Sequence, residues 1–433
     1  MTEEVTSSLN QGQQAAADGF FRFLFEDQKE LIISGPGGVG KTFLMGYMID
    51  TIMPRYAEAC ALMGIKAQYT EVVMTATTNK AAEVLGITTG RPTSTIHSFL
   101  ALKVQDDYST GRSLLTKTRD WRVHHNKIIF IDEASMIDKA LLDMIREGTC
   151  NCKIVFVRDH CQLAPIQEPI SPIYKQRLPF FELTQPMRTS IEALQNINLQ
   201  LRHSVETGEF FPIQVVPGVI DWLDDDEMEA AVNATFLQQN GNNRVLAYTN
   251  QRVVAYNNHI REIRQIHSTY VLGEILINNN AIRLKNGMLS VEEELTIARL
   301  EETTEYVEIE DGVQLEVRYA DLRTGYGETF FGIPLPEDKG HFTALIKHYQ
   351  RAKNWNRYFH LKNTYPDLRP RDAATIHKAQ GSTYDTVFVD LGNLSTCHNP
   401  NQAARLLYVA FSRARSRVIM YGDLAPKYGG VLQ

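Results

Sequence analysis

Short apolar runs rich in β-branched residues alternate with helical stretches through the first 265 residues of the chain. Four such runs are Leu31–Ser34, Glu71–Met74, Lys127–Ile131 and Lys153–Val157. Each is followed by a polar or glycine-bearing turn, a pattern typical of buried parallel strands. The pattern predicts an α/β fold built on parallel sheets.

From residue 266 to residue 367 the pattern changes to an alternation with period two. The segment Tyr306–Val317 shows it clearly, and Asp311–Gly312 within it has the composition of a hairpin turn. From Ala373 onward the α/β pattern returns, with a strand expected at Thr386–Asp390. The sequence therefore predicts a small β-rich module inserted into an α/β domain that resumes after it.

Composition excludes several classes of protein. With 44 basic and 51 acidic residues the net charge is −7, so any path for nucleic acid must be a local groove and not a basic coat. The chain has no apolar run long enough to span a membrane, and its polar, acidic start does not resemble a signal peptide, so we expect a cytoplasmic protein. The five cysteines lack metal-ligand spacing, so we expect reduced thiols and neither zinc nor disulfides.

A phosphate-binding loop is expected at Gly35–Thr42, which matches G-x-x-x-x-G-K-[ST] between a strand and a helix. Backbone N–H groups and the helix N-terminus would surround the phosphates of ATP. Lys41 would pair with the β- and γ-phosphates, and Thr42 would ligate Mg²⁺. The glycines that allow this turn are Gly35, Gly37, Gly38 and Gly40.

Two carboxylates follow the strand Lys127–Ile131, and they belong at the edge of the sheet where ligands of open α/β folds bind. Asp132 is expected to hold Mg²⁺, and Glu133 to orient and deprotonate the attacking water. These features predict a nucleoside triphosphatase, but they do not distinguish among kinases, GTPases, AAA-type machines and helicases.

Further segments, in chain order, resemble the motifs of superfamily 1 helicases. They are residues 9–13 (Q motif), 75–82 (Ia), 93–98 (Ib), 159–163 (III), 183–188 (IV), 245–250 (IVa), 375–382 (V) and 408–414 (VI). Motif V reads T-I-H-K-A-Q-G-S, which is similar to the RecD and Dda branch, superfamily 1B. The resemblance implies an ATP-dependent DNA helicase of bacteriophage origin that moves 5′→3′ on single-stranded DNA and separates duplexes in replication or recombination, in the host cytoplasm.

The resemblance also implies the domain organisation. Two RecA-like motor domains would comprise residues 1–98 with 127–190, and residues 191–265 with 368–433. A β-hairpin pin subdomain would occupy residues 99–126 of the first domain, and a β-rich, SH3-like insertion would occupy residues 266–367 of the second. We expect a functional monomer that binds single-stranded and forked DNA, with a single-strand-binding or recombination protein as a further partner.

Residue roles follow from the same resemblance. Gln13 would contact adenine, Gln162 would sense the γ-phosphate, and Arg188 and Arg413 would stabilise the charge that develops in phosphoryl transfer. The residues expected to face the strand are Thr78, Asn79, His97, Thr249, Asn250, Thr375 and His377, with structural histidines as the alternative at positions 97 and 377. Two positions depart from the family pattern, because Arg158 replaces a glycine of motif III and Asn79 replaces a histidine of motif Ia.

Residues 101–126 suit a β-hairpin with turn residues at Asp106–Gly111, although a plain loop has the same length. The resemblance makes this hairpin a pin that splits the duplex, presenting Tyr108 at its turn or Leu115 on its return strand. Farther along, Lys347–Phe359 interleaves basic and aromatic residues. Trp355 in that segment is a candidate strand contact or a brace for the pin, unless these aromatics form the insertion's own core.

Two other functions remain open on sequence. The motor motifs do not read the sugar, so an RNA or RNA–DNA translocase is the first alternative. A non-catalytic assembly factor that only binds nucleic acid or a partner is the second. Retention of every ATP-site residue argues against the second alternative, because a relic has no chemical need for them.

Overall fold

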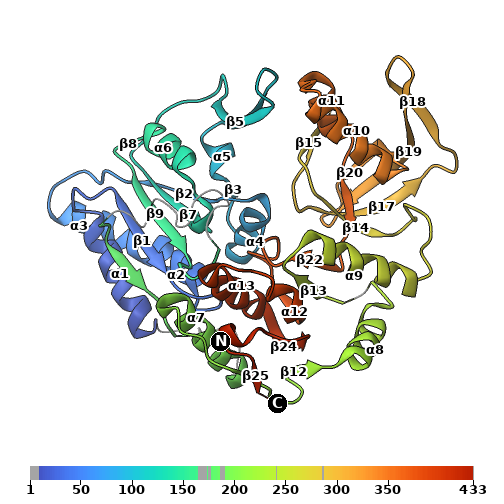
Figure 1. The fold of residues 1–433 in the computed structure, drawn as a ribbon. Helices are drawn as coiled ribbons and strands as arrows, with labels where there is room; N and C mark the ends of the chain where they lie inside the picture. The colour runs from blue at the N-terminus through green and yellow to red at the C-terminus, as the bar shows by residue number, and fades with distance from the viewer. Residues whose placement is uncertain are drawn as a thin grey trace, which may run out of the picture.

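The computed structural model describes residues 9–163, 173, 177–185, 191–239, 241–284 and 287–432. Two α/β domains lie beside each other, and a β-rich insertion and a β-hairpin extend from them toward the same side of the molecule (Figure 1). Among the described residues, no helix combines the length and the apolar character that crossing a membrane requires.

The first α/β domain is built on a parallel sheet in the order β10-β1-β9-β7-β2-β3. Its central strands carry apolar side chains on both faces: Leu31 and Ile33 of β1 pack into one core cluster, and Ile32 packs into another. A sheet covered on both faces explains the continuous apolar runs of the sequence. The strands are β1 (Glu30–Ser34), β2 (Glu71–Ala76), β3 (Thr93–Thr95), β7 (Lys127–Asp132), β9 (Lys153–Arg158) and β10 (Phe180–Glu182).

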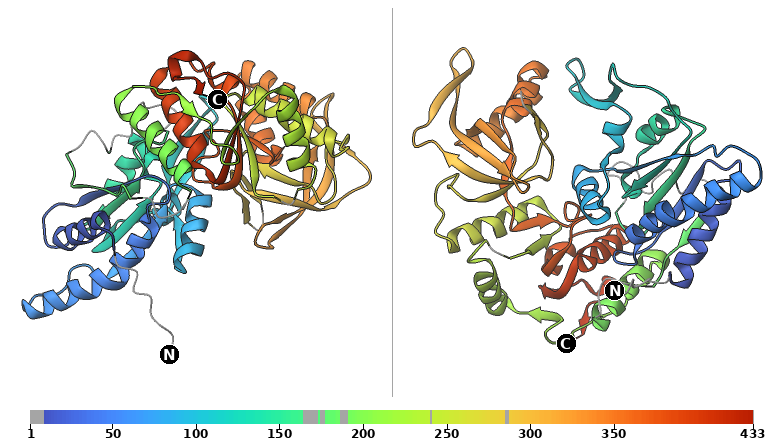
Figure 2. Two further views of the ribbon diagram at one scale, coloured as in Figure 1. Left: turned by 90° about the horizontal axis from the view of Figure 1, so that it is seen from below. Right: turned by 180° about the vertical axis from the view of Figure 1, so that it is seen from behind.

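The helices of this domain cover both faces of the sheet, and α3 extends away from the body of the domain (Figure 2). They are α1 (Gln11–Phe23), α2 (Lys41–Tyr47), a π-helical turn (Met48–Ile52), α3 (Met53–Leu62), α4 (Asn79–Thr89), α5 (Ile96–Phe99) and α6 (Lys139–Glu147).

The second α/β domain has a parallel sheet in the order β12-β24-β23-β13-β22. Its strands are β12 (Ile220–Leu223), β13 (Asn243–Ala247), β22 (Ala373–Thr375), β23 (Tyr384–Asp390) and β24 (Ala414–Tyr421). Its helices are α7 (Glu192–Thr207), α8 (Asp225–Phe236), α9 (Asn250–Ile263), α12 (Leu391–Leu394) and α13 (Pro400–Ser412). A short pair, β11 (Ile213–Gln214) with β25 (Val431–Leu432), lies beside this sheet.

The insertion is an antiparallel β-sheet with two helices packed on it. Its elements are β14 (Ile275–Asn278), β15 (Ile282–Leu284), β16 (Gly287–Leu289), β17 (Glu294–Leu300), β18 (Glu305–Glu310), β19 (Val313–Thr324), β20 (Thr329–Pro336), α10 (Lys339–Arg351), α11 (Trp355–Thr364) and β21 (Leu368–Pro370). The β18–β19 turn falls at Asp311–Gly312, as the pattern predicts. The expected boundary at residue 367 is a few residues early, because β21 pairs with β14 and so belongs to the insertion.

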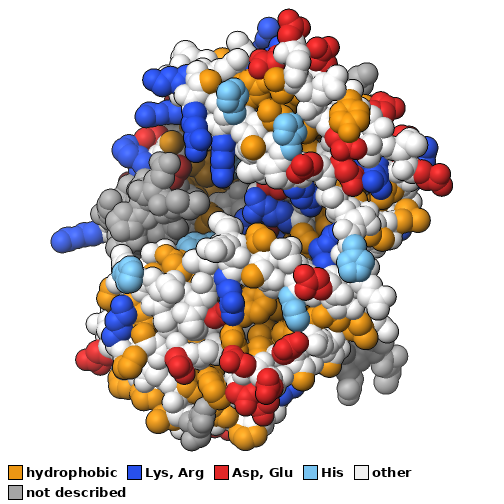
Figure 3. Space-filling model, turned by 45° about the vertical axis from the view of Figure 1, so that its right-hand side comes forward, with side chains coloured by type: hydrophobic (Ala, Val, Ile, Leu, Met, Phe, Trp, Pro, Cys, Tyr) orange, Lys and Arg blue, Asp and Glu red, His pale blue; other side chains and the backbone are white. Residues whose placement is uncertain are grey.

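The segment after α5 forms a hairpin of β4 (Leu102–Asp107) and β5 (Arg112–Lys117). The end of the expected pin segment returns to the first domain, where β6 (His124–His125) pairs with β8 (Thr149–Cys150). On the face shown in Figure 3, charge is distributed unevenly: Lys and Arg side chains gather at the upper left, whereas acidic side chains lie at the upper right and in the lower part.

Candidate active site

The Gly35–Thr42 loop joins β1 to α2 at the edge of the first sheet. Gly38 and Gly40 have φ of 86° and 78°, a region in which a side chain would be strained. A Cβ on Gly35 would lie 2.5 Å from the carbonyl oxygen of Leu183, whereas Gly37 faces open space. The loop is therefore packed on its protein side and open on the side where phosphates would approach.

Lys41 lies across this loop, and its Nζ donates to the carbonyl oxygens of Gly35 (2.7 Å) and Pro36 (2.9 Å). Burial raises the pKa of Asp132 at the end of β7, and the nearby positive charge of Lys41 offsets only part of that rise. Thr42 follows Lys41 in the first turn of α2. A hydroxyl, a partly buried carboxylate and a lysine at a helix N-terminus fit the donor set for Mg²⁺ and a nucleoside triphosphate.

Glu133 occupies the left-handed backbone region, with φ of 51°, directly after β7. Its backbone N–H donates to Oδ1 of Asp132 (2.9 Å). Burial first, and then the charge of Asp132, raise the pKa of Glu133 to about 7. A Cβ on Gly381 would lie 4.0 Å from Oε1 of Glu133, so this carboxylate lies where the two α/β domains meet.

Arg413 caps the C-terminal end of α13 in the second domain and is 5% exposed. Its guanidinium donates to the carbonyl oxygens of Val409 (3.2 Å) and Ser382 (3.2 Å) and to Oγ of Ser412 (2.9 Å). Its positive charge also acts on Glu133 across the cleft between the domains. Arg188, the other expected arginine, lies outside the described residues.

Gln162 lies just beyond β9 and is 4% exposed, with its Nε2 donating to Oδ2 of Asp159 at 3.4 Å. Asp159 also accepts bonds from Arg202 of α7 and Tyr408 of α13. Motif reading missed Arg202 entirely, since no local pattern surrounds it. The apolar helix pattern around Tyr408 gives no sign that its hydroxyl reaches the other domain.

Gln13 is fully buried, and both ends of its side-chain amide are engaged within the protein. Its Oε1 accepts from the backbone N–H of Asn10 (3.1 Å) in a capping box, and its Nε2 donates to the carbonyl oxygen of Val39 (3.2 Å). The amide therefore ties α1 to the phosphate loop, and the expected contact with adenine would need these bonds to be exchanged.

The expected strand contacts come from the ends of strands in both domains. Thr78 and Thr249 cap α4 and α9, so their side chains accept bonds from backbone N–H groups, while Asn79 and Asn250 next to them are exposed. Thr375 is buried at the end of β22. Burial lowers the pKa values of His97 and His377, so both favour the neutral form.

A cleft of about 540 Å³ separates the two domains beside these residues. One wall is α4, from Asn79 to Thr88, and the other is formed by Gly381–Tyr384 of the second domain and the insertion residues Ser290–Glu294. Motif Ia and motif V segments thus face each other across one cleft.

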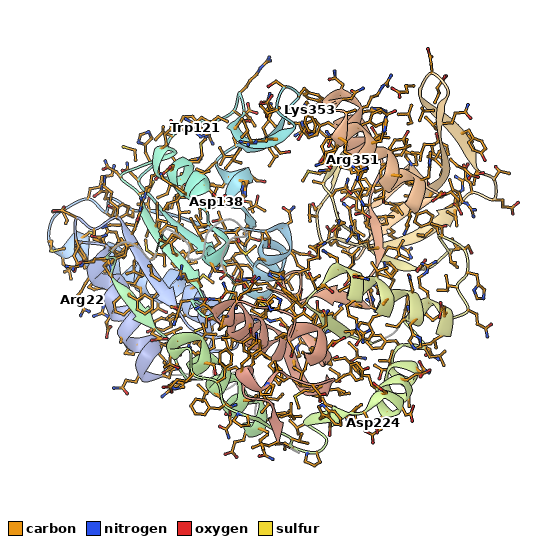
Figure 4. The ribbon with its side chains drawn as sticks, in the orientation of Figure 1. Arg22, Trp121, Asp138, Asp224, Arg351 and Lys353 are labelled. Carbon is orange, nitrogen blue, oxygen red and sulfur yellow. The ribbon has the colours of Figure 1, made fainter. Side chains whose placement is uncertain are left out.

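The tip of the β4–β5 hairpin touches helix α11 of the insertion. The rings of Tyr108 and Phe359 meet edge to face at 5.1 Å, and Nδ2 of Asn363 donates to Oδ2 of Asp106 at 2.8 Å. The ring of Trp355 covers Gly111 so closely that a Cβ there would lie 2.4 Å from it. Lys353, two residues before Trp355, lies beside the hairpin in Figure 4.

These contacts distinguish the aromatic and apolar residues that were expected to act at the hairpin. Trp355 lies against the hairpin, the arrangement of a brace. Tyr108 is at the tip, half exposed, as expected for that position. Leu115 lies on the return strand of the hairpin, where it is partly buried and packs against the core of the first domain. The exposed apolar side chains of the hairpin strands are Val104 and Leu114.

Comparisons with known proteins agree with this arrangement. A family model described as an AAA domain matches residues 8–213, and one described as a UvrD-like helicase C-terminal domain matches residues 372–421. The ATP-dependent DNA helicase dda of Enterobacteria phage T4 is 25% identical, over 94% of this chain and 98% of that protein. The chain is similar to the Dda-like helicases of superfamily 1B.

Two further matches fit this family. The ATP-dependent RecD2 DNA helicase of Deinococcus radiodurans is 24% identical over 91% of this chain, which spans 47% of that protein. A crystal structure of Pif1 helicase from Bacteroides in complex with ADP-AlF3 and ssDNA has a TM-score of 0.53 at 14% identity and covers 98% of this chain and 95% of its own. The Pif1 likeness shows the shared fold. Together these matches identify the chain as an enzyme, a nucleoside triphosphatase of the helicase type.

The two departures from the family pattern have different settings in this helicase. Arg158 is 1% exposed at the end of β9, where burial lowers the pKa of its guanidinium below the usual value. Its backbone carbonyl accepts from Gly35 N–H, which joins motif III to the phosphate loop. Asn79 is exposed at the rim of the cleft, where a histidine ring would also have room.

Proposed function

We propose that this protein is an ATP-dependent DNA helicase that moves 5′→3′ along single-stranded DNA and separates duplex DNA in replication or recombination. The observation that carries the proposal is the position of Glu133 and Arg413 on opposite sides of the domain cleft. Groups needed for one reaction but held by two domains make hydrolysis depend on the distance between those domains. That dependence is the basis of a motor.

At the nucleotide site, Lys41 and the phosphate loop would hold the triphosphate, with Thr42 and Asp132 holding Mg²⁺. The metal supplies charge neutralisation at the phosphates when it is bound. Glu133 accepts the proton of the attacking water. Arg413 exchanges its carbonyl partners for the developing charge, with Arg188 as the second expected arginine.

Closure of the cleft would alter the grip on the strand. Motif Ia and motif V residues lie on opposite walls of the same cleft, so ATP binding brings the two sets of strand contacts together and hydrolysis separates them again. Alternating grips of this kind move the protein along one strand.

Strand separation is assigned to the β4–β5 hairpin. A two-stranded hairpin alone is marginally stable, and a wedge must resist the duplex that it meets. Contacts from Trp355, Phe359 and Asn363 of α11 hold the hairpin tip from the other domain. We therefore assign Trp355 to bracing the pin, with Tyr108 at its tip.

Unwinding of duplexes that carry either a 5′ or a 3′ single-stranded tail tests activity and polarity together. We expect ATP-dependent separation of the 5′-tailed duplex alone, and loss of it in Lys41→Ala. Preference for the 3′ tail would overturn the polarity, and ATP hydrolysis that single strands do not stimulate would overturn the motor. The same hydrolysis assay with DNA and RNA strands of one sequence separates a DNA helicase from an RNA translocase.

A further inference from the structure

The loop Asp159–Leu163, which carries motif III, follows β9 of the first domain in the chain but packs into the second domain. Cys161 and Leu163 are 0% and 5% exposed, and they belong to the hydrophobic core formed by α7, α13 and the sheet of the second domain. Apolar side chains buried in one core resist separation from it. The loop is therefore anchored to the second domain, whereas β9, which precedes it, belongs to the sheet of the first domain.

Polar contacts from the second domain hold the backbone of the same loop. Nη1 of Arg405 on α13 donates to the carbonyl oxygens of His160 (2.6 Å) and Gln162 (2.7 Å). Nε2 of Gln380 donates to the carbonyl oxygen of Leu163 at 3.3 Å. These bonds fix the backbone on both sides of the Gln162 side chain.

Asp159 also holds this loop to the second domain, and both of its carboxylate oxygens accept hydrogen bonds. Oδ1 accepts from Nη1 of Arg202 (2.9 Å) and from the N–H of Cys161 (3.1 Å), while Oδ2 accepts from the hydroxyl of Tyr408 (2.6 Å) and from Nε2 of Gln162 (3.4 Å). Burial alone would raise the pKa of Asp159, but the charges of Lys41 and Arg202 and the bond from Tyr408 lower it. Asp159 therefore remains ionised as a buried acceptor.

The orientation of the Gln162 amide follows from this carboxylate. A carboxylate only accepts hydrogen bonds, so Gln162 must turn its NH₂ group toward Asp159. Its Oε1 is buried without a hydrogen-bond partner among the described residues. Asp159 thus orients the Gln162 amide so that Oε1, and not Nε2, is left to accept a hydrogen bond from another group.

We infer that Tyr408, Arg405 and Arg202 are positioning residues for ATP hydrolysis, which fix the Asp159–Leu163 loop to the second domain so that Gln162 and Arg413 approach the nucleotide as one unit. Tyr408 and Arg413 lie on consecutive turns at the end of α13. The same helix therefore carries Arg413 and the side chain that holds the loop of Gln162. The first domain holds the loop through β9 and through Ser34, whose Oγ lies 3.0 Å from Nδ1 of His160. The inference rests on the proposed function, because it concerns the same hydrolysis.

The test is Tyr408→Phe, which keeps the ring and removes the bond to Asp159. We expect kcat for strand-stimulated ATP hydrolysis to fall about tenfold, the change that follows loss of a hydrogen bond to a buried charge, with KM for ATP changed less than about twofold. Tyr428→Phe is the matched control, because Tyr428 is equally buried in the second domain and its hydroxyl donates to the carbonyl oxygen of Cys397, away from the loop. That control should retain wild-type kcat.

Combination with Gln162→Ala separates positioning from general destabilisation. If Tyr408 acts through Gln162, adding Tyr408→Phe to Gln162→Ala should change kcat less than about twofold. The same tenfold loss in both backgrounds, or wild-type kcat in Tyr408→Phe, would overturn the inference. Arg405→Met removes the two bonds to the loop while keeping the aliphatic stem, and it should show the same dependence on Gln162 if Tyr408→Phe folds poorly. A wild-type protein without strand-stimulated hydrolysis would instead refute the proposed function.

Discussion

Replacing Gly111 by alanine is expected to separate unwinding from ATP hydrolysis. Gly111 ends the turn of the β4–β5 hairpin with φ of 71°, and a Cβ there would lie 2.4 Å from the ring of Trp355. Ordinary contact between carbon atoms is about 3.5–4.0 Å, so the hairpin tip and α11 must move apart by roughly 1 Å or more. That movement would break the contact of Tyr108 with Phe359 and the bond from Asn363 to Asp106.

The aromatic pair and the hydrogen bond are together worth about 1–3 kcal/mol. Their loss corresponds to roughly a 5- to 150-fold fall in the ratio of docked to undocked hairpin. The ATP site lies elsewhere, so strand-stimulated hydrolysis should stay near the wild-type rate. The variant should therefore consume ATP on single strands and unwind a 5′-tailed fork slowly.

Gly312→Ala is the matched control. Gly312 lies in the β18–β19 turn with φ of 75°, nearly the same backbone strain, and a Cβ there would meet nothing within 4 Å. Single-turnover unwinding of a forked duplex should show Gly312→Ala close to wild type and Gly111→Ala well below it. Equal unwinding rates in the two variants would refute the reasoning that α11 supports the hairpin.

Three other predictions concern the nucleotide site. Arg413→Ala should bind ATP with near wild-type affinity while hydrolysis slows by about 10³-fold or more, so unchanged turnover would remove its role. The pKa of Glu133 is raised to about 7 and the base must be ionised, so kcat/KM should rise with pH from 6 to 8 and then level off, and a flat profile would contradict the assignment. Chelation of Mg²⁺ should abolish hydrolysis, and added Mg²⁺ should restore it; hydrolysis in its absence would exclude the site at Thr42 and Asp132.

Part of this structure could be predicted from residues that are close together in the sequence. The strands β1, β7 and β9, the phosphate loop between β1 and α2, and the turn at Asp311–Gly312 all follow from residues close together in the chain. Their signals are the apolar runs of a buried parallel sheet and glycines with positive φ. The order of the motifs likewise indicated a helicase, because the residues expected to contact ATP occur in short segments.

The tertiary structure decided everything that depends on which segments meet. Gln13 is bonded to Val39, Trp355 covers Gly111, β21 joins the insertion, and Arg202 reaches Asp159 from another domain. Each of these contacts joins residues far apart in the chain or depends on the register of a strand, so no local pattern contains it. The sequence determined the chemistry available at the cleft, and packing determined which side chains are free to perform it and which domain carries them.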